Sequence, residues 1–369
     1  MTSTQLSSGS HAVWSLEPHT RAKHDLLERY LGAWYPALAS HNKRILFLDG
    51  FAGPGVYASG EPGSPTIALR TLLEHSHLPQ MSGTEFIFIF NEKDRTRHQK
   101  LLEVVATEQA RHPAWPANVK VFVENENFTS VATEILAQLG TGRLAPTFAF
   151  LDPFGYKDVP IKLIADLMKF DRSELFIYFD HNSAVRFSTA GNVDVQFEAL
   201  FGTDEFKNAP PASDPNRGTF LRDLYRDQLM KECGFKYVRH FEMVNSQGRT
   251  GNYLFFCTRH KLGLEKMKDA MWRVDPQAGN RFSDILAGQQ VLFDDVVDTG
   301  PLRAELKRVF SGRTVSIEMI EDYVLVNTPF AKTHIKVKTL KPMQLAGEIS
   351  SPNQRRPGTF PSETQVTFH

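Results

Sequence analysis

Apolar residues fall in five short runs separated by amphipathic segments, and this alternation predicts a parallel β-sheet. The segments between the runs, and residues 20–39 before the first one, carry apolar residues at helical spacing. Strands that alternate with helices form a parallel sheet with helices on both faces. The five predicted strands are residues 44–49, 85–90, 119–123, 147–151 and 175–179.

Two helix starts are predicted from capping residues. Thr20 precedes the first amphipathic segment, and Ser64 with Pro65 precedes a second predicted helix at about 66–76. Serine and threonine side chains satisfy free N–H groups at a helix start, and proline is favoured at the first helical position.

After the fifth run the pattern changes. Residues 193–232 read as two helices with a Pro/Asp/Asn-rich break, and residues 236–244 and 252–258 read as an antiparallel hairpin. Five parallel strands followed by such a hairpin are expected of the Rossmann-like sheet of a class I methyltransferase. A nicotinamide dehydrogenase usually continues with a sixth parallel strand instead.

Past residue 300 the pattern predicts a separate winged-helix domain. Its wing is a basic hairpin that contains Arg355 and Arg356. Pro342 is expected to end or bend the third helix. The predicted helices are 301–310, 314–326 and 331–345, and the predicted strands are 347–350 and 364–368. The predicted organisation is therefore a disordered tail at 1–19, a Rossmann-like domain at 20–300 with a helical insertion around 188–232, and the winged helix at 301–369.

The end of the first strand carries the strongest chemical signal. Asp49 is followed by a turn that contains Gly50, Phe51, Gly53 and Gly55. Glycine lets the backbone come close to a ligand, and ligands of such sheets bind at the carboxyl ends of strands. This loop resembles the cofactor loop of S-adenosylmethionine-dependent methyltransferases, which implies that Asp49 and the loop backbone hold the methionine end of the cofactor.

The next strands end in further candidates for cofactor binding. Glu92 is placed to bond both ribose hydroxyls, with Asp94 as the competing acid. Asn127 and Phe128 follow the third strand, where methyltransferases place groups around the adenine. Asn127 also suits a helix N-cap.

The fourth strand ends in Asp152-Pro153-Phe154-Gly155, which is predicted to face the methyl acceptor. Amino-methylating enzymes carry Asp/Asn-Pro-Pro-aromatic at this place. Glycine and phenylalanine here depart from that motif, so the acceptor atom stays open.

Two other ligands are alternatives at the same strand ends. The carboxylates of Asp49, Glu92, Asp94 and Asp152 would suit Mg²⁺ if they converged, although no metal site is predicted. A dinucleotide needs a helix directly after the glycine turn to bind its pyrophosphate, and about ten residues, 56–65, intervene here.

Charge is unevenly divided in a chain whose formal net charge is zero. Residues 301–369 contain ten Lys and Arg against six Asp and Glu, which leaves +4, so residues 1–300 carry −4. A basic module suggests a polyanion, and Lys332 and Lys336, four apart, with Arg355 and Arg356 are predicted to bind nucleic acid. Ordinary surface charge is the alternative.

The start of the chain and the two cysteines indicate where the protein acts. The N-terminus has no basic start and no apolar core, so a signal peptide is not expected. Cys233 and Cys257 match no metal or disulfide spacing. The chain is predicted to be cytoplasmic.

Several motifs together resemble the three-Cys-motif partner proteins. These motifs are His24–Trp34, Asp49–Gly55, Gly63–Pro65, Phe150–Gly155 and Arg356–Pro361. The resemblance implies a methyltransferase-like protein that is encoded beside a radical-enzyme-like partner with three cysteines.

The sequence therefore predicts an S-adenosylmethionine-dependent methyltransferase-like protein that acts on nucleic acid. A non-catalytic nucleic-acid or protein adaptor that retains the fold is the alternative. A nucleotide-dependent redox enzyme is a third.

Overall fold

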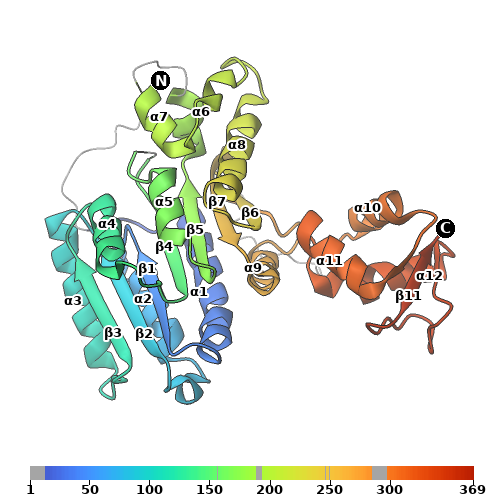
Figure 1. The fold of residues 1–369 in the computed structure, drawn as a ribbon, viewed down its shortest axis with the longest axis horizontal. Coiled ribbons are helices and arrows are strands. Elements are labelled where there is room, and N and C mark those ends of the chain that lie inside the picture. Colours follow the sequence, from blue (N-terminus) through green and yellow to red (C-terminus); the bar gives the residue numbers. More distant parts are fainter. Residues whose placement is uncertain (1–12, 156, 188–192, 246, 249, 285–296) are drawn as a thin grey trace.

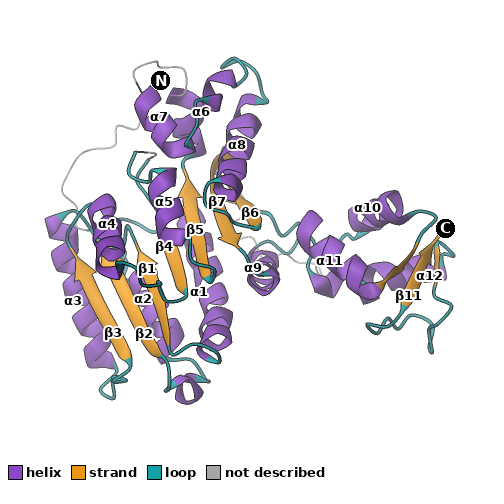
Figure 2. Ribbon diagram, in the orientation of Figure 1, coloured by secondary structure: helices purple, strands orange, loops and turns teal. Residues whose placement is uncertain are grey.

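The computed structural model describes residues 13–155, 157–187, 193–245, 247–248, 250–284 and 297–369. Its centre is an eight-stranded sheet in the order β3-β2-β1-β4-β5-β7-β6-β8 (Figures 1 and 2). Strands β1 to β5 are parallel to one another, and β7 is antiparallel to both β5 and β6. The strands are β1 Arg44–Asp49, β2 Glu85–Asn91, β3 Val119–Glu124, β4 Thr147–Leu151, β5 Ser173–Phe179, β6 Tyr237–Val244, β7 Thr250–Thr258 and β8 Arg281–Ser283. The five parallel strands and the antiparallel hairpin predicted from the sequence are confirmed, and β8 was not foreseen.

Helices cover both faces of this sheet. Side chains of α1, α2, α3 and α9 form one hydrophobic core with the sheet, and those of α4, α5, α7 and α8 form the other. No described helix is both long and apolar enough to cross a membrane. The helices are α1 Pro18–Ala39, α2 Ser64–Leu73, α3 Arg95–Arg111, α4 Phe128–Leu139, α5 Ile161–Met168, α6 His181–Phe187, α7 Asp194–Phe201, α8 Arg217–Lys231 and α9 Lys261–Val274.

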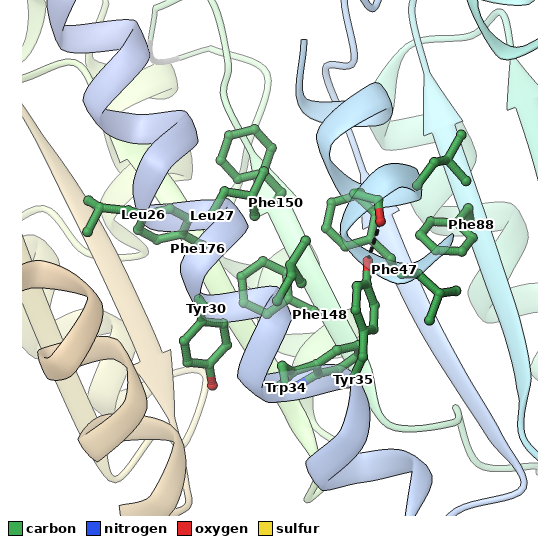
Figure 3. Close-up of a cluster of buried hydrophobic side chains, with 14 of the residues drawn as sticks. Leu26, Leu27, Tyr30, Trp34, Tyr35, Phe47, Phe88, Phe148, Phe150 and Phe176 are labelled. Carbon is green, nitrogen blue, oxygen red and sulfur yellow. Dashed lines mark hydrogen bonds between the residues drawn. The ribbon is translucent and has the colours of Figure 1, made fainter. Parts of the chain in front are cut away.

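Aromatic side chains dominate the core beneath α1 (Figure 3). Phe47 of β1 and Phe148 of β4 stack with their ring centroids 5.9 Å apart. Tyr30 and Trp34 of α1 pack on Phe148 from above. Each such buried side chain stabilises the fold by roughly 1.5–3 kcal/mol. The apolar stripe of α1 thereby fixes the helix across the middle of the sheet.

Both predicted helix caps were wrong, Thr20 by three residues and Ser64 by one. α1 begins at Pro18 with Glu17 as its N-cap, because proline fills a position whose N–H would have no helical partner. α2 begins at Ser64 with Gly63 as its N-cap. Gly63 is held in this position by its N–H, which donates to Gly55 O at 2.9 Å.

Residues 300–369 form a C-terminal module with a hydrophobic core that is completed by Trp272 of α9. Three helical segments pack against a three-stranded antiparallel sheet in the order β10-β11-β9. Its elements are α10 Gly300–Phe310, β9 Thr314–Ser316, α11 Ile317–Asn327, a 3₁₀ turn Lys332–His334, a π-helical turn Lys336–Leu340, α12 Lys341–Leu345, β10 Ile349–Ser350 and β11 Gln365–Phe368.

The helix predicted at 314–326 was wrong at its start, where Thr314–Ser316 form β9 instead. The helix predicted at 331–345 was also wrong in one respect, because three different helical turns replace it. Pro342 lies in the first turn of α12 and has no N–H. The carbonyl of Lys338, four residues earlier, instead accepts from Thr299 Oγ1 at 2.9 Å.

One buried lysine joins the module to the sheet domain. Lys268 of α9 is 1% exposed, and its Nζ donates to the carbonyls of Val324, Leu325 and Thr328 at 2.9, 3.0 and 2.9 Å. These carbonyls lie at the carboxyl end of α11, where a helix lacks internal donors and carries partial negative charge. Trp272 adds a bond from its Nε1 to Pro329 O at 2.8 Å.

We expect Lys268→Met to destabilise the docking of the module. The apolar side chain fills similar space but leaves three carbonyls without their donor, at a cost of about 3 kcal/mol. Chemical denaturation followed by circular dichroism measures the change. Lys266→Met on the same helix is the control, because Lys266 is more exposed and has only a 3.9 Å ion pair with Asp269. Equal losses for both variants would contradict this role of Lys268.

Candidate functional site

A cavity of about 340 Å³ lies where the chain leaves the carboxyl ends of the central strands. The strand order reverses here, since β2 and β3 lie on one side of β1 and β4 and β5 on the other. Open α/β sheets bind ligands at such a switch point. The walls come from the segment before α1, the first turns of α1, the loop 51–57, and the ends of β4 and β5.

The glycine loop after β1 forms the floor of this cavity. Gly53 and Gly55 have φ angles of 61° and 75°, a region that side chains other than glycine disfavour. Gly50 has a different requirement, because a Cβ there would lie 2.6 Å from the Phe128 ring and 2.7 Å from Leu151. The predicted loop glycines are thus required by the backbone, and Gly53 and Gly55 also line the cavity.

The residues between the glycine loop and α2 lead away from Gly55 and then come back to it. Val56 and Pro62 form an isolated antiparallel bridge, and Gly63 comes back against Gly55. Thr66 in the first turn of α2 donates its hydroxyl to Gly55 O at 3.0 Å. The start of α2 therefore lies beside the glycine loop, and the sequence-based expectation that the helix is too distant for a pyrophosphate was wrong.

Asp49 lies beneath the loop, is fully buried and lines neither the cavity nor the small hollow described below, so a ligand would reach it only if the loop shifts. Its Oδ1 accepts from the Phe51 N–H at 3.2 Å, whereas its Oδ2 has no hydrogen-bond partner among the described residues. Burial raises the pKa of Asp49 to about 7, against the lowering effects of the Ser64 hydroxyl and the Phe51 N–H. A buried carboxylate oxygen without a donor is costly, and a cationic ligand would satisfy it.

Lys23 is a site residue that sequence reasoning missed. It lies one turn into α1, is 6% exposed, and forms an ion pair with Asp152 at the end of β4. Its Nζ also lies 5.0 Å from the centre of the Tyr178 ring. The available signal was a lysine on the apolar stripe of α1, four residues before Leu27 and seven before Tyr30.

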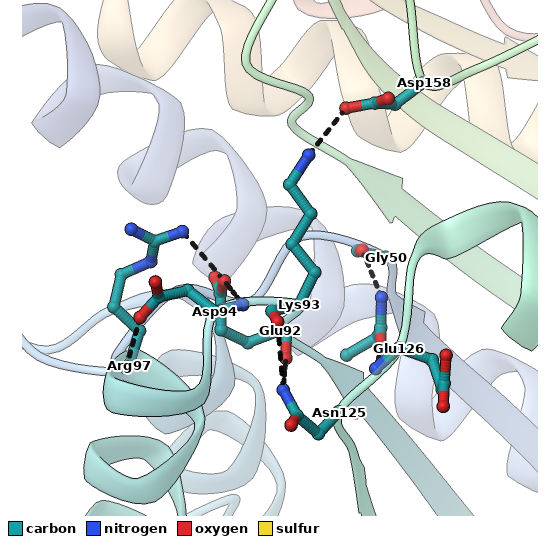
Figure 4. A network of polar contacts seen from close by, with 9 residues as sticks. Gly50, Glu92, Lys93, Asp94, Arg97, Asn125, Glu126 and Asp158 are labelled. Carbon is teal, nitrogen blue, oxygen red and sulfur yellow. Dashed lines mark hydrogen bonds and ion pairs between the residues drawn. The ribbon is translucent and has the colours of Figure 1, made fainter.

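A second, smaller hollow of about 20 Å³ adjoins the first, and Phe51 and Phe154 line both. Glu92 lines it at the end of β2 and is 4% exposed. Its Oε1 accepts from the Asp94 N–H at 2.7 Å and from Arg97 at 3.0 Å (Figure 4). Glu92 is thus held in place next to the glycine loop, as a ribose-binding acid would need to be.

Asn127 and Phe128 lie at the start of α4, on the side of this hollow. Phe128 lines the hollow and packs on Phe51 with ring centroids 5.4 Å apart. Asn127 is an exposed N-cap whose side chain accepts from the Ser130 N–H at 2.9 Å, and it lines neither hollow. Contact between Asn127 and a ligand stays a prediction.

Asp152, Pro153 and Phe154 all line the main cavity. Phe154 is 66% exposed at its rim, and its ring centroid lies 5.4 Å from that of Trp14. Trp14 also accepts a backbone bond from Ala58 at 2.7 Å through its carbonyl. The prediction of a disordered tail at 1–19 was therefore wrong for residues 14–19. Residues 1–12 lie outside the described residues.

The charged groups that line the cavity are mainly acidic. Glu17, Asp152 and Asp180 line it, with Asp49 beneath, against the single ammonium of Lys23. Burial lowers the pKa of the lining residue His24 to about 3, so its ring is neutral. Within the described part of the chain no three acidic, histidine or cysteine side chains converge to hold a metal ion, so the four predicted carboxylates do not form a Mg²⁺ site.

The four predicted nucleic-acid contacts lie in the C-terminal module and divide into two kinds. Lys332 and Lys336 do share a side, but both pair with Glu321, at 3.1 and 3.0 Å. Arg355 and Arg356 are exposed in the loop between β10 and β11.

Comparisons with known proteins give only distant likenesses. No protein-family model and no curated protein matches the chain, so membership of the three-Cys-motif partner family stays a prediction. Human methyltransferase-like protein 13, solved in complex with SAH, has a TM-score of 0.35 and 12% identity, covering 77% of this chain and 99% of that chain. The putative methyltransferase yhhF from Escherichia coli has a TM-score of 0.27 and 17% identity, covering 63% of this chain and 88% of that chain. At these scores we assign the fold from the strand order of this chain itself.

We expect the protein without ligand to lose stability as the pH rises from 5.5 to 8, because of Asp49. In the unfolded chain an aspartate with a pKa near 4 is ionised throughout this range, whereas the folded protein takes up a proton below about pH 7. The folded state binds more protons, so the free energy of unfolding falls with rising pH, by about 2 kcal/mol from this group.

Asp49→Asn should remove this component, because asparagine does not titrate. Urea denaturation of wild type and variant at pH 5.5 and pH 8 measures the difference between their unfolding free energies at each pH. The same substitution at the exposed Asp166 of α5 is the matched control and should leave the pH dependence unchanged. A difference between wild type and Asp49→Asn that is the same at both pH values would show that Asp49 is ionised throughout.

Proposed function

We propose that this protein binds S-adenosylmethionine in the cavity above β1 and transfers its methyl group to an acceptor at the cavity mouth. The observation that carries the proposal is the Asp49 carboxylate, fully buried under a left-handed glycine loop with one oxygen unpartnered. The cofactor supplies an ammonium group for such an oxygen and a methyl group activated on a sulfonium ion. The strand order and the position of the cavity support the same ligand.

Each wall of the site has a matching task in this proposal. Asp49 and the loop at Gly53 and Gly55 would hold the methionine end of the cofactor. Glu92 would bind the ribose hydroxyls, and Phe128 would lie against the adenine. The main cavity of about 340 Å³ has room for the methionine end, whereas the small hollow of about 20 Å³, which shares Phe51 with it, would have to widen to admit the adenine.

Asp152, Pro153 and Phe154 would receive the acceptor. Lys23 holds the Asp152 carboxylate in one orientation, so that its oxygens are aimed rather than free to rotate. The exposed ring of Phe154 and the half-buried ring of Trp14, tilted by 56° to each other, provide an apolar rim for an acceptor ring. Methyl transfer depends strongly on alignment, so positioning by these groups would supply much of the rate.

Electrostatics favour this cofactor over a dinucleotide, the ligand of the redox alternative. The returning start of α2 would suit a pyrophosphate by geometry alone. The acidic lining of the cavity, with its single ammonium already paired to Asp152, would repel two phosphate charges. A ligand that carries a sulfonium and an ammonium group is complementary to the same surface.

For the acceptor we propose nucleic acid, bound through the C-terminal module. The order of its elements, with three helical segments, β9 after the first and a β10–β11 hairpin at the end, supports a winged helix as part of this proposal. A radical-enzyme-like partner with three cysteines is a further proposal, which rests on the sequence resemblance. A non-catalytic adaptor with the same fold is the competing function.

Calorimetric titration of the full chain with S-adenosylmethionine at pH 8 tests the cofactor. We expect saturable binding, and a loss of at least tenfold in affinity for Asp49→Asn, because a buried charge-assisted hydrogen bond contributes about 1.5–3 kcal/mol. Asp166→Asn should bind as wild type does.

The oxidised nicotinamide dinucleotide serves as a second titrant for the redox alternative. Folded wild-type protein that takes up no S-adenosylmethionine would refute the enzyme and leave the adaptor. Preferential binding of the dinucleotide would favour the redox enzyme instead.

A further inference from the structure

Some Lys and Arg side chains of the C-terminal module form ion pairs with carboxylates, and others do not. Residues 301–369 contain ten Lys and Arg side chains. Half of them pair with carboxylates of the same module. Arg303 and Lys307 pair with Glu348, Arg308 pairs with Glu305, and Lys332 and Lys336 pair with Glu321. These five charges are largely neutralised within the fold.

The other five, Arg313, Lys338, Lys341, Arg355 and Arg356, form no ion pair with any described residue. Arg313 lies against the ring of Phe310. The remaining four belong to the last helical turns and to the loop between β10 and β11. We call Lys338, Lys341, Arg355 and Arg356 the wing cluster.

The wing cluster is held together by contacts between α12 and the loop. The side chain of Lys341 packs on Gly358, where an added Cβ would lie 3.2 Å from three of its carbons. Gln344 of α12 donates to Gln354 Oε1 at 2.6 Å and accepts from the Gly358 N–H at 2.8 Å. The loop that carries Arg355 and Arg356 is thereby fixed against the helix that carries Lys341.

The loop is also ordered at its other side. Asn353 donates to Glu363 O at 2.9 Å and accepts from the Gln365 N–H at 2.9 Å. Two exposed arginines on an ordered loop that packs on Lys341, with the exposed Lys338 three residues before Lys341, place four positive charges on one part of the module. Unpaired like charges in one region repel each other, and an anionic partner relieves that repulsion.

We propose that the wing cluster binds the phosphodiester backbone of a nucleic-acid duplex, and that Lys332 and Lys336 do not. This inference rests on the nucleic-acid acceptor proposed above and names its contact surface. A duplex fits better than a single strand, because single-strand sites use exposed aromatic rings for stacking. The large hydrophobic side chains exposed in the described part of this module are Met319, Val337 and Leu345, none of them aromatic.

The position of the wing cluster assigns it an anchoring role. α12 and β11 lie at the far end of the molecule from β1, β2 and β3 along its longest axis (Figure 1). The cavity at the carboxyl end of β1 is therefore remote from the cluster. A duplex held at the wing cluster would tether the protein, while a separate part of the nucleic acid reaches the cavity.

Fluorescence anisotropy with labelled 24-base-pair DNA, the matching RNA duplex and single-stranded DNA tests this surface in the full chain. We compare wild type with Lys338→Gln/Lys341→Gln/Arg355→Gln/Arg356→Gln and with the matched control Lys332→Gln/Lys336→Gln. Each protein is measured between 50 and 300 mM NaCl, with its melting temperature recorded.

We expect wild type to bind a duplex with a log–log salt slope of about −3 to −4, as four phosphate contacts predict. The fourfold variant should lose at least tenfold in affinity at 100 mM NaCl and show a flatter slope, whereas the control stays within about threefold. Comparing the affinities for the DNA duplex and the RNA duplex shows which of the two the protein prefers.

Three results would overturn the proposal. These are an unchanged affinity in the fourfold variant, a greater loss in the control, or tighter binding of single-stranded DNA than of either duplex. Titration of the fourfold variant with S-adenosylmethionine separates the two proposals. If the fourfold variant binds the cofactor but not the duplex, both proposals are supported. If the wild type binds no cofactor, only the proposed enzyme is refuted.

Discussion

The ammonium group of Lys23 is the interaction on which the site depends. It is buried where α1 crosses the carboxyl ends of the strands, it pairs with Asp152, and its charge also acts on Asp49. Without it, no nearby ammonium would offset the repulsion between the carboxylates of Asp49 and Asp152. A buried ion pair adds little net stability compared with apolar residues, but it fixes one arrangement of its partners. Lys23 thereby links the packing of α1, which is a feature of the fold, to the electrostatics of the cavity.

A second buried lysine plays a similar part between the sheet domain and the C-terminal module. Lys268 donates from its Nζ to the carbonyls that end α11, as Lys23 donates from its own to a strand-end carboxylate. In both places a lysine from a helix that covers one face of the sheet satisfies buried acceptors, which are a side-chain carboxylate for Lys23 and backbone carbonyls for Lys268. The two parts of the chain are thus joined by directional bonds as well as by the apolar contacts around Trp272.

The five parallel strands and the hairpin were predictable because their apolar runs are long and are separated by clear helical periods. Chain order also placed Asp49, Glu92 and Asp152 at one edge of the sheet. Lys23 stood out as a lysine on the apolar stripe of α1, but its contact with Asp152 and the position of Trp14 were not predictable, since both depend on the tertiary path of α1 and of the segment before it. The return of α2 to Gly55 was hidden for the same reason: it depends on a loop closed by hydrogen bonds between residues eight apart. Sequence spacing also placed Lys332 and Lys336 together, but it could not show that Glu321 neutralises both.

The division of charge has a consequence for how the molecule moves through a solution of polyanions. A body of net charge −4 and a module of net charge +4, set along one elongated axis, give a neutral protein a large permanent dipole moment. A long nucleic acid would exert a torque on this dipole before any contact forms and would turn the module toward itself. Encounters would then be oriented rather than random, and salt would remove that orientation over a distance set by the Debye length of about 8 Å at physiological ionic strength. A protein with no net charge can in this way still be steered.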